Sequence, residues 1–202
     1  HTLWHLLRKD GIRNGLHFVH RLDRETSGVV IVAKSPAAAD KLRMQFQSKR
    51  VGKRYLALVS GDFPSKTVKA SGYLLRDSES AVRKKRLFVP SDRNESPKKS
   101  AKWCVTHLQC VRREKGVSLV EAIPETGRPH QIRATLLALG YPIVGDKLYG
   151  PDETIFLRFI DDSITAEDNR VLQLDRQALH AYKIRISHPE SGEKMSFQAD
   201  FP

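Results

Sequence analysis

One short stretch of the sequence places a carboxylate among several basic side chains. The run His20-Arg21-Leu22-Asp23-Arg24-Glu25-Thr26-Ser27-Gly28 surrounds Asp23 with cations and closes with three residues typical of a turn. Nearby positive charges favour the ionised form of a carboxylic acid, and an ionised Asp can act as a nucleophile. A solvated ion pair in a surface turn accounts for the same residues equally well, because such pairs are common. The stretch alone leaves both interpretations open.

An Asp that must remain ionised needs a partner that keeps its charge. Arginine meets this requirement, since it does not lose its proton and can form two parallel hydrogen bonds with a carboxylate. The candidates are Arg128, in the turn before a predicted helix, and Arg133, early on that helix. The backbone N–H groups at the helix start would also favour phosphate or carboxylate. By composition alone, however, an ordinary exposed helix arginine is the simpler explanation of Arg133.

The composition limits the class of protein and its partners. The 202 residues are 40% hydrophobic, enough to bury a core, and we expect one domain over residues 1–202 that is trimmed at its N-terminus because the chain opens on His1. A net charge of +12 indicates a polyanionic partner such as nucleic acid. Two cysteines, and no apolar run near the roughly 20 residues of a membrane span, favour a cytoplasmic protein that makes no contact with membrane. We expect a monomer.

The hydrophobic pattern predicts a mixture of helices and strands. Helices are expected at Leu3–Leu7, at Pro36 to about Ser48 with Ser35 as N-cap, and at His130–Leu139. Strands are expected at 29–32, 53–61, 103–111, 117–123, 178–187 and 194–199.

Two polar segments are predicted to lack regular structure. Arg83–Lys102, rich in basic residues, is predicted to be a mobile loop, either solvated or in contact with RNA, and Asp161–Arg170 a polar insertion.

Three residues raise the question of a metal site. Cys104, His107 and Cys110 lie within one predicted strand. In a strand, alternate side chains point to opposite faces, so His107 would face away from both thiols, and a structural zinc site needs four converging ligands. We therefore predict that no metal is bound.

Four segments of the chain together resemble a known family. They are His20–Gly28, Lys53-Arg54-Tyr55-Leu56-Ala57-Leu58-Val59-Ser60-Gly61, Gly127-Arg128-Pro129-His130-Gln131-Ile132-Arg133 with Gly140–Asp146, and Leu179–Ala181 through His188-Pro189. Their motifs and order resemble those of pseudouridine synthases of the ribosomal large-subunit (RluA) type. One departure is Ala134-Thr135, where many members have a small residue and then His.

The resemblance implies a fold and a reaction. It implies an α+β fold, a mixed and largely antiparallel sheet flanked by helices, and the isomerisation of uridine to pseudouridine in RNA without cofactor or metal. Asp23 would be the catalytic residue and Arg133 would pair with it. Tyr55 would pack on the uracil ring and could take part in removing a proton. Without the resemblance, Tyr55 is as well explained as a core aromatic of a strand.

RNA binding would draw on residues around this trio. A stacked uridine must leave the helix to reach Asp23, and Arg21 would fill the space that the base vacates. Arg24, Arg128 and the basic loop would contact phosphates. The expected RNA-binding set is Arg21, His20, Arg24, Arg128, His130 and Gln131. The expected partner is ribosomal RNA of the 23S type, with transfer RNA as the alternative.

Two rival functions remain. The first is an aspartyl-phosphate enzyme, in which an Asp accepts a phosphoryl group. Such an Asp normally follows an apolar strand and has a second Asp two residues later, whereas this chain has Glu25 at that position. An RNA-binding module without activity would need only the net charge. It predicts that Asp23→Asn leaves all function intact.

Overall fold

The structure is a computed structural model that describes residues 3–9, 15–92 and 100–202. The five helices of these residues are α1 (Leu3–Lys9), α2 (Pro36–Gln47), α3 (Gln131–Ala138), α4 (Thr154–Ile160) and α5 (Ala166–Leu172). The strands are β1 (His17–Phe18), β2 (Ser27–Gly28), β3 (Val32–Ala33), β4 (Gly52–Ser60), β5 (Val68–Arg76), β6 (Arg86–Pro90), β7 (Lys102–Glu114), β8 (Val117–Pro124), β9 (Leu179–Ser187) and β10 (Lys194–Gln198).

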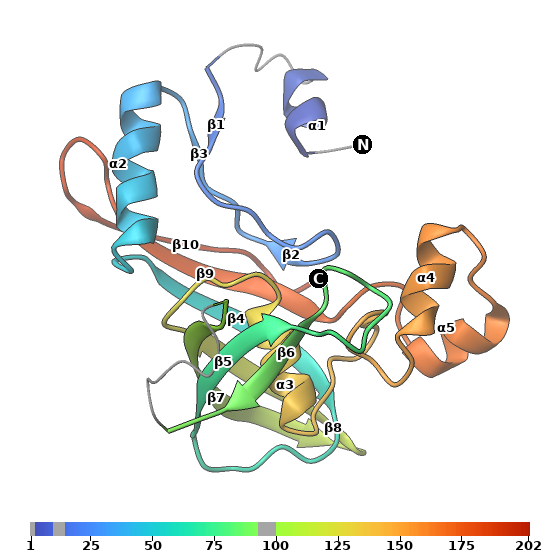
Figure 1. The fold of residues 1–202 in the computed structure, drawn as a ribbon. Helices are drawn as coiled ribbons and strands as arrows, with labels where there is room; N and C mark the ends of the chain where they lie inside the picture. The colour runs from blue at the N-terminus through green and yellow to red at the C-terminus, as the bar shows by residue number, and fades with distance from the viewer. Residues whose placement is uncertain (1–2, 10–14, 93–99) are drawn as a thin grey trace.

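One large sheet forms the centre of the molecule (Figure 1). Its strands lie in the order β10-β9-β4-β8-β7-β5-β6, and every neighbouring pair in this order is antiparallel. The short strand β2 pairs in parallel with β9, so the sheet is mixed but mostly antiparallel. This arrangement confirms the predicted α+β fold. The strand pair β1–β3 forms a separate small sheet beside α2.

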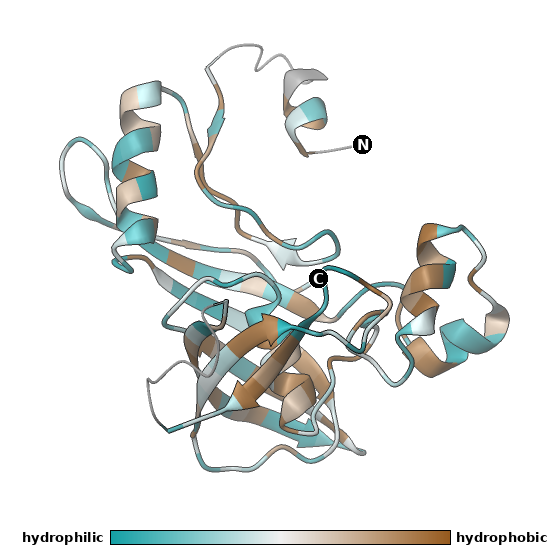
Figure 2. Ribbon diagram, viewed as in Figure 1, coloured by the Kyte–Doolittle hydropathy of each residue, from teal (hydrophilic) through white to brown (hydrophobic). Residues whose placement is uncertain are grey.

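Two hydrophobic clusters hold the helices on the sheet. The larger joins α3 to the central strands and includes Leu136, Leu108 and Val120, all fully buried. The smaller joins α2 to β9 through Leu42 and Ile184. Figure 2 shows hydrophobic residues concentrated in the central strands and alternating with hydrophilic ones along α2. Burial of these apolar surfaces, at about 25 cal/mol per Å², is the main force that fixes the helices in place.

Several elements follow the sequence prediction closely. Helix α2 begins after Ser35, whose hydroxyl accepts a hydrogen bond from the Ala38 N–H, and has Pro36 at its first position. The expected strands from residue 53 to residue 61 and from residue 117 to residue 123 appear as β4 and β8. Helix α1 covers the predicted residues and continues to Lys9.

Other segments differ from the prediction. The apolar run 29–32 is not one strand, because β2 joins β9 whereas β3 turns away to pair with β1. Part of the expected loop 83–102 is strand β6, which hydrogen-bonds to β5, and residues 93–99 lie outside the described residues.

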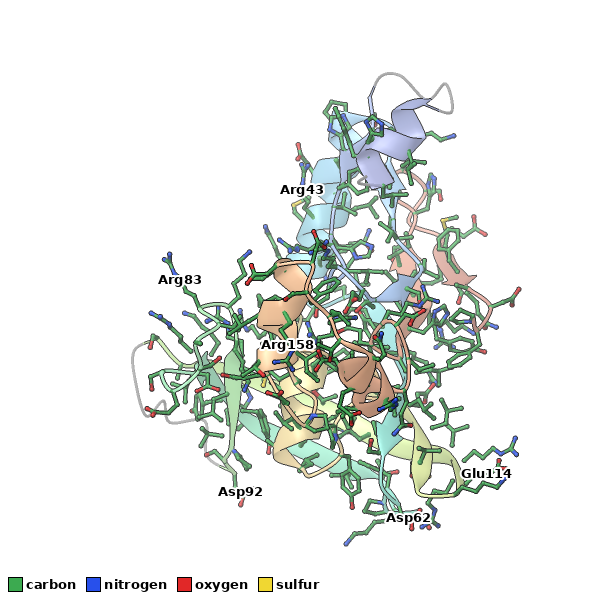
Figure 3. The ribbon with its side chains drawn as sticks, turned by 90° about the vertical axis from the view of Figure 1, so that its right-hand side faces the viewer. Arg43, Asp62, Arg83, Asp92, Glu114 and Arg158 are labelled. Carbon is green, nitrogen blue, oxygen red and sulfur yellow. The ribbon has the colours of Figure 1, made fainter. Side chains whose placement is uncertain are left out.

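The polar segment 161–170 was also wrongly predicted to be irregular. It contains the start of α5, where Thr165 and Asp168 form a reciprocal capping box. Arg158 of α4, labelled in Figure 3, donates hydrogen bonds to both Asp168 carboxylate oxygens and so ties the two helices together. In the part of the chain that the structure describes, no helix is both long and apolar enough to cross a membrane.

Candidate active site

The predicted ion pair between Asp23 and Arg133 is present. The Arg133 Nη1 lies 3.0 Å from the Asp23 Oδ2, although the two residues are 110 positions apart. The Asp23 side chain is 23% exposed and that of Arg133 only 9%. A carboxylate that remains accessible is thus held by a cation that is nearly inaccessible. Arg133 is therefore not an ordinary exposed helix arginine, the simpler interpretation that the sequence composition alone would favour.

A second carboxylate fixes Arg133 from the other side. Asp146 accepts hydrogen bonds from the Arg133 Nε at 2.7 Å and Nη2 at 2.8 Å. It also accepts two more from the backbone N–H groups of Leu148 and Tyr149. Its side chain is completely buried. Burial alone would lower the pKa of Arg133, but the hydrogen bonds and charge of Asp146, together with Asp23, hold that pKa above its ordinary value.

The ring of Tyr149 closes the site beneath Arg133. The guanidinium lies 4.8 Å from the centre of this fully buried ring, an arrangement that favours a cation. The Tyr149 hydroxyl accepts a hydrogen bond from the Arg86 N–H and lies 2.9 Å from the His130 Nδ1. Either group can be the donor in this second hydrogen bond, because the assignment depends on the His130 tautomer. Burial lowers the pKa of His130.

Tyr55 lies on β4 close enough to Asp23 for the charge of that carboxylate to act on it. Burial, and secondly the charge of Asp23, raise the pKa of Tyr55 to about 12. At neutral pH the side chain is therefore a phenol and not a phenolate. It can pack on a base and donate a hydrogen bond, but it is poorly suited to remove a proton.

The turn that carries Asp23 is attached to β9 and the segment before it. The Thr26 N–H closes the turn on the Asp23 carbonyl, and the Thr26 hydroxyl oxygen accepts a hydrogen bond from Gln177. Gly28 has φ +109°, and a Cβ there would lie 2.3 Å from the Ala181 carbonyl oxygen. Only glycine lets the backbone approach β9 this closely.

The residues expected to bind RNA fall into two groups. Arg21, Arg24 and Arg128 are exposed, as phosphate contacts require. Gln131 is buried, and its amide bonds within the protein to Thr126, Thr106 and the Val105 carbonyl.

His20 is also engaged within the protein. Its Nε2 accepts a hydrogen bond from the Ile31 N–H, and its ring stacks on Phe46. Contact of His20 and Gln131 with RNA remains a prediction. In this structure both side chains contact other parts of the protein around the site.

The thiols and imidazole considered for a metal site do not converge. Cys104 is fully buried, whereas the His107 Nε2 lies 2.7 Å from Glu125 in an exposed pair. Among the described residues, no group of three or more His, Cys, Asp or Glu side chains is arranged to hold a metal ion.

Sequence reasoning missed three residues of the site. Asp146 lies at the end of the segment Gly140–Asp146, but no local pattern indicates its role, and the same holds for Lys147 and Tyr149. The available signal was the grouping Gly145-Asp146-Lys147-Leu148-Tyr149-Gly150, where charged residues interrupt an otherwise apolar and glycine-rich turn.

Comparisons with known proteins agree on one family. A family model described as RNA pseudouridylate synthase matches residues 4–138. Ribosomal large subunit pseudouridine synthase D of Zymomonas mobilis is 33% identical over 184 residues, covering 91% of this chain and 52% of that protein. The synthase C of Haemophilus influenzae is 37% identical over 186 residues, covering 91% and 51%. The chain thus spans about half the length of the curated relatives it matches.

Solved structures give the same result. The human RNA Pseudouridylate Synthase Domain Containing 1 matches with a TM-score of 0.76 and 30% identity, covering 98% of this chain and 74% of that one. The human RNA Pseudouridylate Synthase Domain Containing 4, at 23% identity and a TM-score of 0.70, shares the fold. From the family model, the relatives and the fold together, the chain belongs to the RNA pseudouridylate synthase family.

Proposed function

We propose that this chain isomerises uridine to pseudouridine in RNA, with Asp23 as the catalytic residue. The observation that carries the proposal is the partly exposed Asp23 carboxylate, held at 3.0 Å by a buried arginine in a chain of net charge +12. A basic protein that keeps one fixed anion open to solvent can attract RNA and still present a carboxylate to it.

The reaction needs little beyond this anion and an ordered pocket. The bond between the sugar and the base nitrogen breaks, the base turns, and a bond forms to ring carbon 5, whose hydrogen is lost while a nitrogen gains one. Substrate and product are isomers, so the step is balanced without an oxidant or an energy source. Asp23 would act at the sugar or the ring, Arg133 would hold it in position, and the Tyr55 phenol would pack on the uracil.

The substrate class follows from the relatives. The two relatives described above are named ribosomal large subunit pseudouridine synthases. We therefore propose ribosomal RNA of the large subunit as substrate and the cytoplasm as the location, with the chain acting as a monomer. Exposed Arg21, Arg24 and Arg128 would contact the strand, so the affinity should fall with salt.

The test compares two matched variants. Total RNA from cells lacking the gene is incubated with the protein, with Asp23→Asn or with Asp62→Asn, and pseudouridine is mapped by a chemical stop. Asp62, labelled in Figure 3, is an exposed residue of the turn after β4 and controls for the loss of a surface carboxylate.

We expect new stops with the protein and with Asp62→Asn, and none with Asp23→Asn, whose RNA affinity should stay within a few fold. An active Asp23→Asn variant would end the catalytic assignment. Bound RNA without any stop, with all three proteins, would favour the inactive binding module instead.

A further inference from the structure

Next to Asp146, the chain carries a buried lysine that has no part in the chemistry proposed above. Lys147 is 4% exposed. Its Nζ donates hydrogen bonds to the Glu25 Oε1 at 2.6 Å and to the Asp175 carbonyl. The same Nζ lies 4.6 Å from the centre of the Phe159 ring. Of the three N–H donors of an ammonium group, two go to Glu25 and Asp175, and the charge also faces the Phe159 ring.

This arrangement excludes the usual role of a lysine in an RNA-binding protein. A lysine that contacts phosphate must reach solvent with free donors, whereas the Lys147 side chain is 5% exposed and its donors are directed at protein groups. Its carboxylate partner is also largely enclosed, because the Glu25 side chain is 19% exposed. Burying such a pair is costly unless it is well bonded.

The pair connects the Asp23 turn to the turn that fixes Arg133. Glu25 lies two residues after Asp23, within the turn closed by the Thr26 N–H and the Asp23 carbonyl. Lys147 directly follows Asp146, which holds the Arg133 guanidinium through two hydrogen bonds. Two consecutive residues therefore act on the two halves of the Asp23–Arg133 pair. The negative Asp146 holds Arg133, and the positive Lys147 holds the turn of Asp23 through Glu25.

We propose that the Lys147–Glu25 ion pair is a positioning device that sets the Asp23 carboxylate against Arg133, and that Lys147 and Glu25 are positioning residues for the reaction. Three ion pairs make up the device, Glu25–Lys147, Asp146–Arg133 and Arg133–Asp23, and the backbone joins Asp146 to Lys147. Phe159 of α4 completes the device, because the Arg24 guanidinium also lies 4.9 Å from its ring. The inference rests on the proposed role of Asp23.

The physical reason for an effect on rate is geometric. Asp23 has a single hydrogen bond to Arg133. Thr26 and Gly28 hold the far end of the turn on β9 and Gln177, so loss of the Glu25–Lys147 pair would free the part that carries Asp23 to move by up to about 1 Å. Misplacement on this scale can cost up to 100-fold in rate without altering substrate affinity. Loss of the pair should therefore lower the single-turnover rate and leave the dissociation constant for RNA nearly unchanged.

The experiment is a double-mutant cycle with Glu25→Gln, Lys147→Met and the double variant. Glu153→Gln is the matched control, because Glu153 is also bonded to a lysine, Lys85, and its side chain is 26% exposed. Each protein is assayed at saturating RNA, well below its unfolding midpoint, and its RNA affinity is measured by titration. Hydrogen exchange at the Thr26 amide, which bonds the Asp23 carbonyl, reports opening of the turn without reference to activity.

We expect each single variant to lose about tenfold or more in single-turnover rate, with an RNA affinity within threefold of the unaltered protein. The double variant should lose no more than the worse single variant, because residues that act as one unit are not additive. The Thr26 amide should exchange faster in all three, and Glu153→Gln should lose stability but not rate.

Two results would overturn the inference. One is a rate within threefold of the unaltered protein in both single variants; the other is a double variant whose losses multiply. Failure of the proposed function would look different, since the unaltered protein would then yield no pseudouridine at all, and the positioning role would be refuted along with it.

Discussion

Neutralising Asp146 should destabilise the protein far more than neutralising a surface carboxylate. Asp146 is the fully buried end of the Arg133 ion pair and accepts four hydrogen bonds. Asp146→Asn keeps the size of the side chain but replaces one acceptor oxygen by an NH₂ group. That group must face either a guanidinium or a backbone N–H, and both are donors.

The magnitude follows from the burial of the partners. Removing one partner of a buried ion pair costs about 3–5 kcal/mol, because the other charge is left uncompensated. Asp23 still faces Arg133 in the variant, so we expect the lower end of this range, about 3 kcal/mol. For a domain of this size each kcal/mol lowers the unfolding midpoint by about 2–4 °C. The midpoint should therefore fall by about 6–12 °C.

Urea and thermal denaturation followed by circular dichroism would measure this loss. The control is Asp40→Asn, which removes one end of the exposed Asp40–Arg43 pair on α2 and should cost about 0.5 kcal/mol or less. A loss for Asp146→Asn below about 1 kcal/mol, or no larger than that of the control, would refute the view that Asp146 compensates a buried charge.

Three further outcomes are expected. Arg133→Lys should keep part of the turnover and Arg133→Met almost none, because only a cation can pair with Asp23; equal single-turnover rates would show the pairing to be unimportant. Gly28→Ala should lower the free energy of unfolding by about 2 kcal/mol or more, since its Cβ would meet the β9 carbonyl at 2.3 Å. Gly116→Ala, which has open space around it, should lose only about 1 kcal/mol in the same urea titration. Burial lowers the pKa of His20 from 6.5 to about 4, so the unfolded chain binds more protons in this interval and stability falls as the pH falls through it. His20→Gln should flatten that slope in urea titrations across the interval, and an unchanged slope would contradict the assignment.

The sequence predicted elements whose signals are local. Helix α2 was found because Ser35 and Pro36 mark its start in any context. Strand β5 was missed because Ser71-Gly72 interrupts its apolar pattern. Gly72 is needed there for a tertiary reason, since a Cβ would lie 2.3 Å from the Val89 carbonyl of β6. Neighbouring strands, which no local pattern shows, determine that residue.

The candidate site was predicted in part for the same reason. The Asp23–Arg133 pair came from the resemblance, because its members are 110 residues apart and no spacing rule connects them. Asp146 and Lys147 escaped notice because charged residues in a turn are usually solvated, and only the tertiary structure buries both. The burial that makes these residues important is the property that their local sequence conceals.

The long separations within the site also bear on how the protein is made. Chains leave the ribosome from the N-terminus, and domains fold as units. Arg133 is synthesised 110 residues after Asp23, and His180, the β9 partner of Ser27, is synthesised 153 residues after Ser27. A nascent chain therefore carries the segment His20–Gly28 before the partners of Asp23 and Ser27 exist. On the proposed role of Asp23, the chain can act on RNA only after Arg133 and strand β9 have been synthesised.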